Sequence, residues 1–144
     1  MLKAVVDTNV WVSGLLNPHG LPAEVVDAWC RGRFAAVVPA MVLEEIRDVL
    51  GRLRIRRRFR LTDEEVAEFV RSVGEGVSVI ATSGLELGCR DPKDDALLEA
   101  ATISSADAIV TRDDDLKRDA DLVEKMQRAG TTVMSVSAFL RLLQ

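Results

Sequence analysis

The chain has 144 residues, of which 48% are hydrophobic and 29% charged; this composition is typical of a globular protein with one substantial core, and we expect one domain over residues 1–144. The formal net charge of −4 argues against general polyanion binding. No apolar run approaches the ~18 residues of a membrane span, and Asp7 interrupts the apolar start of the chain, so we expect neither a membrane segment nor a signal peptide.

Cysteine and histidine are too sparse to suggest a site of their own. Cys30 and Cys89 form neither a metal-ligand spacing nor a disulfide framework. Reduced thiols favour a cytoplasmic location. The single His19 lies in a Pro-His-Gly loop, and nothing else in the sequence points to a Ser-His-Asp triad around it.

The first apolar run, residues 2–6, ends abruptly in Asp7-Thr8-Asn9. So short a run with β-branched valines favours a strand buried on both faces, as in a parallel sheet. Ligands of such sheets bind at the carboxyl ends of the strands, which makes Asp7 a candidate functional carboxylate. Alternatively, Asp7 caps the helix predicted at 9–16. The next predicted elements are a loop at 17–20, a helix at 21–30 and a buried strand at 34–38.

A helix is predicted from Pro39 to about Leu53, because apolar residues recur there at helical spacing. Glu44 falls opposite the apolar face and is expected to face solvent. Glu45 falls on the edge of that face, where the helix should meet the sheet. An arginine-rich connection at 52–60 follows.

The sequence Thr62-Asp63-Glu64-Glu65 is a capping box that begins a helix reaching residue 74. Another helix starts at Pro92. In it Asp94 shares the inward face with Leu97 and Leu98, whereas Asp95 projects sideways. A core-facing carboxylate at a helix start needs a backbone amide or a cation as its partner. The other predicted elements are a strand at 77–80, a loop at 81–92, a strand at 108–111, one or more helices within 116–129, a strand at 131–134 and a helix at 135–143.

Strands and helices alternate throughout the chain. This order predicts a three-layer α/β/α fold with a central parallel sheet of about five strands.

Four carboxylates could meet in this fold. Asp7 and Asp113 follow strands, Asp94 begins a helix, and Glu45 lies at a helix–sheet edge. Crowded carboxylates repel one another unless a cation compensates them, and oxygen ligands without His or Cys favour Mg²⁺ or Mn²⁺. Such a site suits in-line displacement at phosphorus. Singly, Asp94 and Asp113 could also be helix caps.

Four segments in order resemble the PIN-domain nucleases, of the branch grouped with VapC-like toxins of toxin–antitoxin pairs. They are VVDTN at 5–9, VLEEIRDVL at 42–50, DPKDDALLEAA at 91–101 and ADAIVTRDDDL at 106–116.

The resemblance implies an Mg²⁺- or Mn²⁺-dependent ribonuclease that leaves a 5′-phosphate and a 3′-hydroxyl, with a homodimer and an antitoxin as partners. Asp7 and Asp94 would be direct metal ligands, and Glu45 and Asp113 would complete the shell. The supporting residues would be Thr8, Asn9 and Thr111, with Asp115 as an extra ligand. Relatives often carry another residue where Asp95 stands, so Asp94 and Asp95 could exchange roles.

The arginine run has three interpretations. Arg54, Arg56, Arg57 and Arg58 could bind RNA phosphates, with Phe59 stacking on a base. The run could instead dock an acidic partner such as an antitoxin tail, or be a solvated linker.

The same residues argue against two other classes of phosphoryl-transfer protein. A haloacid-dehalogenase-like phosphatase needs a second Asp where Asn9 stands, and a phosphorylation receiver needs an Asp after the third strand, where the sequence reads Ile80-Ala-Thr-Ser. A catalytically silent RNA- or protein-binding module stays open as the main alternative. The apolar helices 21–30 and 135–143 could form the seam of a homodimer.

Overall fold

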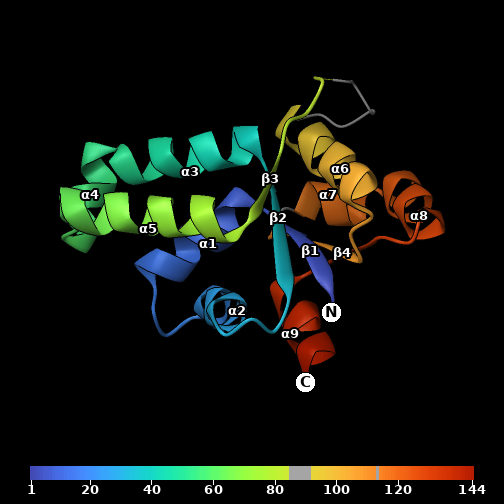
Figure 1. Ribbon diagram of the computed structural model, residues 1–144, viewed down its shortest axis with the longest axis horizontal. Coiled ribbons are helices and arrows are strands. Elements are labelled where there is room, and N and C mark those ends of the chain that lie inside the picture. The colour runs from blue at the N-terminus through green and yellow to red at the C-terminus, as the bar shows by residue number, and fades with distance from the viewer. Residues whose placement is uncertain (85–91, 113) are drawn as a thin grey trace.

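The computed structural model describes residues 1–84, 92–112 and 114–144, without the side chains of Asp114 and Asp115. Within these residues all paired strands run parallel, in a five-stranded sheet of order β3-β2-β1-β4-β5. Helices lie on both sides of the sheet (Figure 1), with α1, α2 and α5 on one side and α6 and α8 on the other. The predicted three-layer α/β/α class is therefore confirmed. The strands are β1 (Lys3–Val6), β2 (Ala35–Pro39), β3 (Ser78–Ile80), β4 (Ala108–Val110) and β5 (Thr132–Met134).

The helices follow the predicted order with two differences. The arginine-rich connection is itself a helix, because arginine is a good helix former; it ends at Arg60, which adopts a left-handed conformation with φ 52°. The 116–129 region contains two helices, since Asp119 caps the second by accepting a hydrogen bond from Leu122 N at 3.2 Å. The helices are α1 (Thr8–Leu16), α2 (Leu21–Cys30), α3 (Ala40–Gly51), α4 (Leu53–Phe59), α5 (Asp63–Gly76), α6 (Pro92–Ser104), α7 (Asp114–Arg118), α8 (Ala120–Arg128) and α9 (Val136–Leu143).

The predicted capping box at the start of α5 is confirmed. Thr62 Oγ1 accepts a hydrogen bond from Glu65 N at 3.1 Å, and Glu65 Oε1 accepts one from Thr62 N at 3.2 Å. Of the helices described, none is long and apolar enough to cross a membrane.

β1 is the central strand, and its last three residues are completely buried. Val5 pairs with Val37 of β2 and with Ile109 of β4. Trp11 in α1 donates its indole N–H to Val6 O at 3.1 Å and packs edge-on against Trp29. These contacts hold α1 directly over the carboxyl end of β1, and so determine where Asp7 lies.

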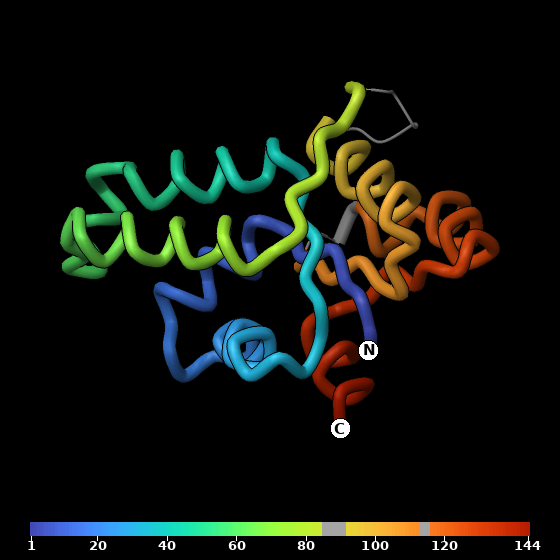
Figure 2. Tube along the Cα trace, viewed as in Figure 1, coloured from blue at the N-terminus to red at the C-terminus, as the bar shows by residue number. Residues whose placement is uncertain are grey.

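The path of the chain changes direction between β1 and β4. From β1 the chain moves outward to β2 and β3, and it then crosses to β4 and β5 on the other side of β1 (Figure 2). In open parallel sheets such a switch point opens a crevice beyond the carboxyl ends of the two strands. Asp7 follows β1 and Thr111 follows β4, so the crevice lies between these two residues.

Candidate acidic site at the carboxyl ends of the central strands

Asp7 is completely buried at the end of β1 and also caps α1. Its Oδ1 accepts a hydrogen bond from Thr8 N at 2.7 Å, and its Oδ2 accepts one from Thr111 Oγ1 at 2.8 Å. Its backbone N–H is bonded to Val110 O at 3.0 Å. The capping role considered for Asp7 is therefore confirmed. It does not exclude a functional role, because the capped carboxylate lies at the switch point of the sheet.

A lysine connects Asp7 with Glu45. Lys93 Nζ lies 3.6 Å from Asp7 Oδ1 and 3.7 Å from Glu45 Oε1, and the lysine side chain is only 16% exposed. Lys93 was not among the residues predicted to belong to the site. The one available signal was its position beside Asp94 in the segment DPKDD.

Glu45 reaches the site from α3 with a side chain that is 35% exposed, whereas Glu44 faces solvent. The predicted difference between these neighbours is confirmed. It follows from the helical period, which turns successive residues by about 100°.

Asp94 and Asp95, in the first turn of α6, are both buried, with exposures of 4% and 7%. The inward placement predicted for Asp94 is confirmed. The sideways placement predicted for Asp95 does not leave it near solvent, because α6 packs against β1, β2, β3, β4 and α3 and is enclosed on its flanks as well. Burial therefore does not distinguish the two aspartates.

Two of the predicted acidic groups, Asp113 and the side chain of Asp115, lie outside the described part of the structure. Within that part, no group of three His, Cys, Asp or Glu side chains is close enough to hold a metal ion. The structure thus brings Asp7 and Glu45 together through Lys93, buries Asp94 beside that lysine, and leaves the full quartet a prediction.

The donor atoms at the site nevertheless suit a hard divalent cation. The carboxylates of Asp7 and Glu45 converge on one position. In the two residues that follow Asp7 in the chain, the buried oxygens Thr8 Oγ1 and Asn9 Oδ1 have no hydrogen-bond partner among the described residues. Oxygen donors of this kind are the ligands that Mg²⁺ and Mn²⁺ prefer.

A groove of about 590 Å³ adjoins the acidic site. Thr111 lines the groove and also binds Asp7, so the two features share a wall. The lining carries the cations Arg112 and Lys117 and the aromatic ring of Phe59. Arg112 is held in place by a hydrogen bond from its Nη1 to Ser13 Oγ at 2.7 Å.

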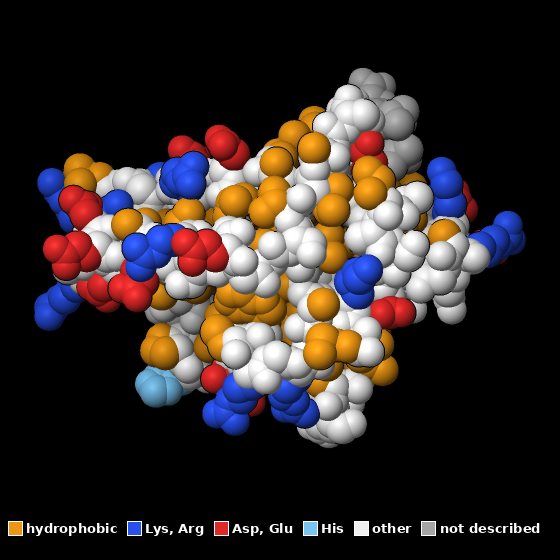
Figure 3. Space-filling view, viewed as in Figure 1, with side chains coloured by type: hydrophobic (Ala, Val, Ile, Leu, Met, Phe, Trp, Pro, Cys, Tyr) orange, Lys and Arg blue, Asp and Glu red, His pale blue; other side chains and the backbone are white. Residues whose placement is uncertain are grey.

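The arginines of α4 differ in what they contact. Arg56 of α4 donates from Nε to Leu50 O of α3 at 2.8 Å and forms an ion pair with Asp63 of α5. Its side chain therefore connects these three helices. Arg54, Arg57 and Arg58 are exposed. α4 lies at the outer end of α3 and α5 (Figure 1), where side chains of both charges are interspersed (Figure 3). Phe59, its last residue, lines the groove.

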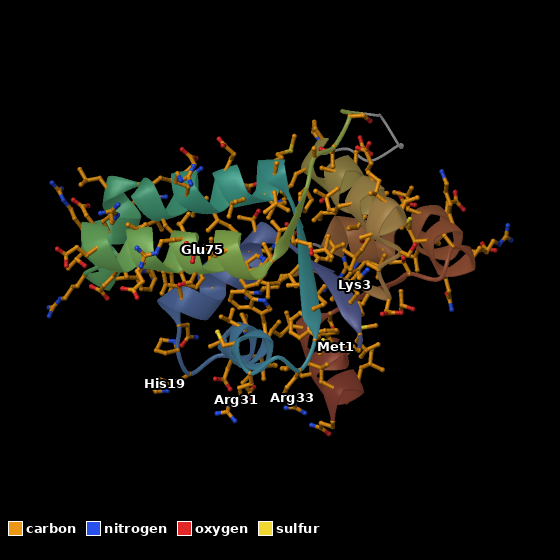
Figure 4. The ribbon with its side chains drawn as sticks, viewed as in Figure 1. Met1, Lys3, His19, Arg31, Arg33 and Glu75 are labelled. Carbon is orange, nitrogen blue, oxygen red and sulfur yellow. The ribbon has the colours of Figure 1, made fainter. Side chains whose placement is uncertain are left out.

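The remaining candidates do not join the site. His19 is exposed in the loop between α1 and α2 and points outward (Figure 4). Cys30 is an exposed free thiol, and Cys89 lies outside the described residues.

The domain has a parallel sheet, a buried aspartate after its central strand and further acidic residues on two flanking helices. This arrangement places acidic groups at the switch point of the sheet, where ligands of such folds bind. The sequence model of the PIN-domain family matches residues 3–115, and the chain belongs to that family, whose members are generally nucleases.

Several known proteins are similar to the chain. Uncharacterized protein MJ1680 of Methanocaldococcus jannaschii is 30% identical over 116 residues, which cover 80% of this chain and 73% of that protein. Among solved structures, VapBC2 from Rickettsia felis, bound to a DNA fragment from their promoter, aligns with a TM-score of 0.53 and 14% identity over 93% of this chain and 98% of that chain. SSO1118, a PilT N-terminus domain protein of Sulfolobus solfataricus P2, aligns with a TM-score of 0.47 and 12% identity over 99% of this chain and 93% of that chain.

Proposed function

We propose that the protein is a divalent-cation-dependent endoribonuclease that hydrolyses phosphodiester bonds of RNA. The observation that carries this proposal is the convergence of Asp7 and Glu45 on one cation position at the switch point of the sheet. Membership of the PIN-domain family supports nuclease chemistry. The preference for RNA rests on the resemblance of the four acidic segments to VapC-like proteins.

The proposed ligands of the Mg²⁺ or Mn²⁺ ion are Asp7, Glu45, Asp94 and Asp113, with Asp115 as an extra ligand. When bound, such an ion would act as a Lewis acid that activates water and offsets negative charge on the phosphate. The protein contributes orientation. Thr111 and the N-terminus of α1 hold the Asp7 carboxylate in one geometry, and the next two residues, Thr8 and Asn9, carry buried oxygens that are available to bind water.

The groove beside the site is the proposed path of the RNA strand. Arg112 and Lys117 are suited to phosphate contacts, and the ring of Phe59 is suited to stacking on a base. Exposed Arg54, Arg57 and Arg58 of α4 are further candidates for phosphate contacts, on a surface where acidic side chains also lie. Arg56, predicted with them, has the backbone of α3 and Asp63 as partners instead, so we assign it a structural role.

A toxin role with a cognate antitoxin is proposed on a narrower basis. Its support is the VapC-like resemblance together with the similarity of the fold to a VapBC2 complex. The homodimer also remains a proposal. α2 and α9 pack against each other, which uses part of their apolar surface, but Leu21 and Leu142 on these helices remain exposed for a second copy.

The test is cleavage of end-labelled RNA by purified protein, first in EDTA and then with Mg²⁺ or Mn²⁺. Cleavage should require the added ion and should leave 5′-phosphate ends. Asp7→Asn should lower the rate at least ~100-fold while the protein stays folded, because asparagine is as good a helix cap as aspartate. Asp121→Asn, on the exposed side of α8, is the matched control.

The alternative function predicts a different outcome. A catalytically silent module would bind RNA but would not cleave it with either ion. Cleavage that survives Asp7→Asn would also contradict the proposal.

A further inference from the structure

We propose that Lys93 is the resident counter-cation of the acidic site. It holds Asp7 and Glu45 together until a divalent cation takes its place, and it thereby weakens the binding of that cation. The inference rests on the proposed function only in taking Asp7 and Glu45 as ligands.

The environment of Asp7 calls for a compensating positive charge. Its carboxylate is completely buried, and its two neutral donors, Thr8 N and Thr111 Oγ1, bring no net positive charge. A buried carboxylate that lacks a compensating charge is strongly unfavourable. Lys93 supplies this charge at 3.6 Å from Oδ1.

The same ammonium serves a second carboxylate on another helix. Lys93 Nζ lies 3.7 Å from Glu45 Oε1. Asp7 follows β1, Glu45 belongs to α3 and Lys93 to α6. The carboxylates of Asp7 and Glu45 lie on separate elements, so the backbone alone does not hold them together. The positive charge of Lys93 offsets the repulsion between them.

A Mg²⁺ or Mn²⁺ ion held by the carboxylates of Asp7 and Glu45 would compete with the Lys93 ammonium for the same two groups. Lys93 has to leave, and its flexible four-carbon stem together with its 16% exposure gives it a way out. The incoming ion therefore has to replace the ion pairs that Lys93 makes with Asp7 and Glu45, which lowers its net affinity.

The first experiment measures Mn²⁺ binding by titration calorimetry, without RNA. Lys93→Met should bind Mn²⁺ at least ~10-fold more tightly than the wild type, a difference of about 1.4 kcal/mol. Lys93→Arg keeps the positive charge and should stay within about threefold of the wild type. An unchanged Kd in folded Lys93→Met would overturn the inference.

The matched control is Lys3→Met. Lys3 lies at the opposite end of β1 (Figure 4), is also partly buried, and donates from Nζ to Ser104 O at 3.0 Å. This control should leave Mn²⁺ affinity unchanged. Thermal unfolding in EDTA adds a second measurement, in which Lys93→Met should lose more stability than Lys3→Met and should recover more of it when Mn²⁺ is added.

The second experiment uses the wild-type chain, so it does not depend on whether a variant folds. The lysines of the sequence are Lys3, Lys93, Lys117 and Lys125, so their rates of reductive methylation can be followed separately by peptide mass spectrometry. Saturating Mg²⁺ should raise the rate at Lys93 severalfold as its ammonium is released, and should leave Lys3 and Lys125 unchanged. An unchanged rate at Lys93 while Mg²⁺ is bound would contradict the displacement.

The outcomes separate this inference from the function on which it rests. If the wild type binds Mn²⁺ and Asp7→Asn does not, but Lys93→Met binds as the wild type does, only the role of Lys93 is wrong. If the wild type binds no Mn²⁺ through Asp7, the proposed function fails, and the inference fails with it.

Discussion

Thr111 donates its hydroxyl proton to Asp7 Oδ2 at 2.8 Å, and this bond joins the residues that follow the adjacent strands β1 and β4. Both side chains are completely buried. The bond orients the Asp7 carboxylate across the switch point, and the same threonine forms part of the groove wall. Thr111 is therefore the structural link between the acidic site and the proposed path of the RNA.

Thr111→Val tests this link. The substitution keeps the shape of the side chain but leaves a buried carboxylate oxygen without its donor, so the free energy of unfolding should fall by about 1–3 kcal/mol. Cleavage should slow about tenfold, because the orientation of Asp7 is relaxed. Urea unfolding and RNA cleavage measure the two effects. Thr132→Val, at an exposed position on β5, is the control, and equal stability of the two variants would contradict the assigned role.

Asp94→Asn and Asp95→Asn separate two aspartates that burial does not distinguish. Asp94 shares the stripe of α6 that carries Leu97 and Leu98, all of them buried, so we expect it to be the ligand. Asp94→Asn should abolish Mn²⁺ binding in calorimetry, and Asp95→Asn should retain it. The reverse result would exchange the roles of the two residues.

Charge reversal on α4 tests its contact with RNA. Arg57→Glu and Arg58→Glu change exposed residues, so RNA affinity should fall and its dependence on salt should become weaker, since each lost phosphate contact reduces the slope. Protein stability should change by less than about 0.5 kcal/mol. Unchanged affinity and an unchanged slope would leave α4 as a solvated helix or as a docking site for a protein partner.

Arg56→Gln should behave in the opposite way. The guanidinium of Arg56 binds Leu50 O and Asp63, and its loss should destabilise the junction of α3, α4 and α5 by about 1 kcal/mol. RNA affinity should stay close to that of the wild type once the comparison is restricted to folded protein. Thermal unfolding and filter binding measure the two quantities. A large loss of affinity without a loss of stability would return Arg56 to the RNA-binding surface.

Phe59→Leu tests base stacking in the groove. Leucine keeps most of the apolar volume but removes the aromatic face, and stacking of a base on such a face contributes about 1–3 kcal/mol. Affinity for single-stranded RNA should fall accordingly, while affinity for Mn²⁺ should not change. Equal RNA affinity in the variant and the wild type would exclude stacking at this position.

The features that the sequence predicted correctly depend on local periodicity, such as which residues of a helix face solvent. Glu44 and Glu45 are neighbours, yet the helical period alone predicted different environments for them. In the structure Glu44 is exposed, whereas Glu45 is partly buried beside Lys93. The same period did not predict the burial of Asp95, because a helical wheel describes one helix and contains no information about what encloses its flanks. The arginine run was predicted as a connection but is a helix, because arginine has a high helix propensity that is independent of its charge pattern.

By itself, the sequence determined the alternation of strands and helices, the capping of α5 and the candidate acids that follow β1 and lie on α3 and α6, because spacing and side-chain chemistry are properties of short segments. Tertiary structure decided that Lys93 lies between Asp7 and Glu45 and that Thr111 binds Asp7. It also decided that Arg56 binds the backbone of α3. Each of these depends on the distance between groups on separate elements, and that distance is set by the order of the strands and the packing of the helices upon them.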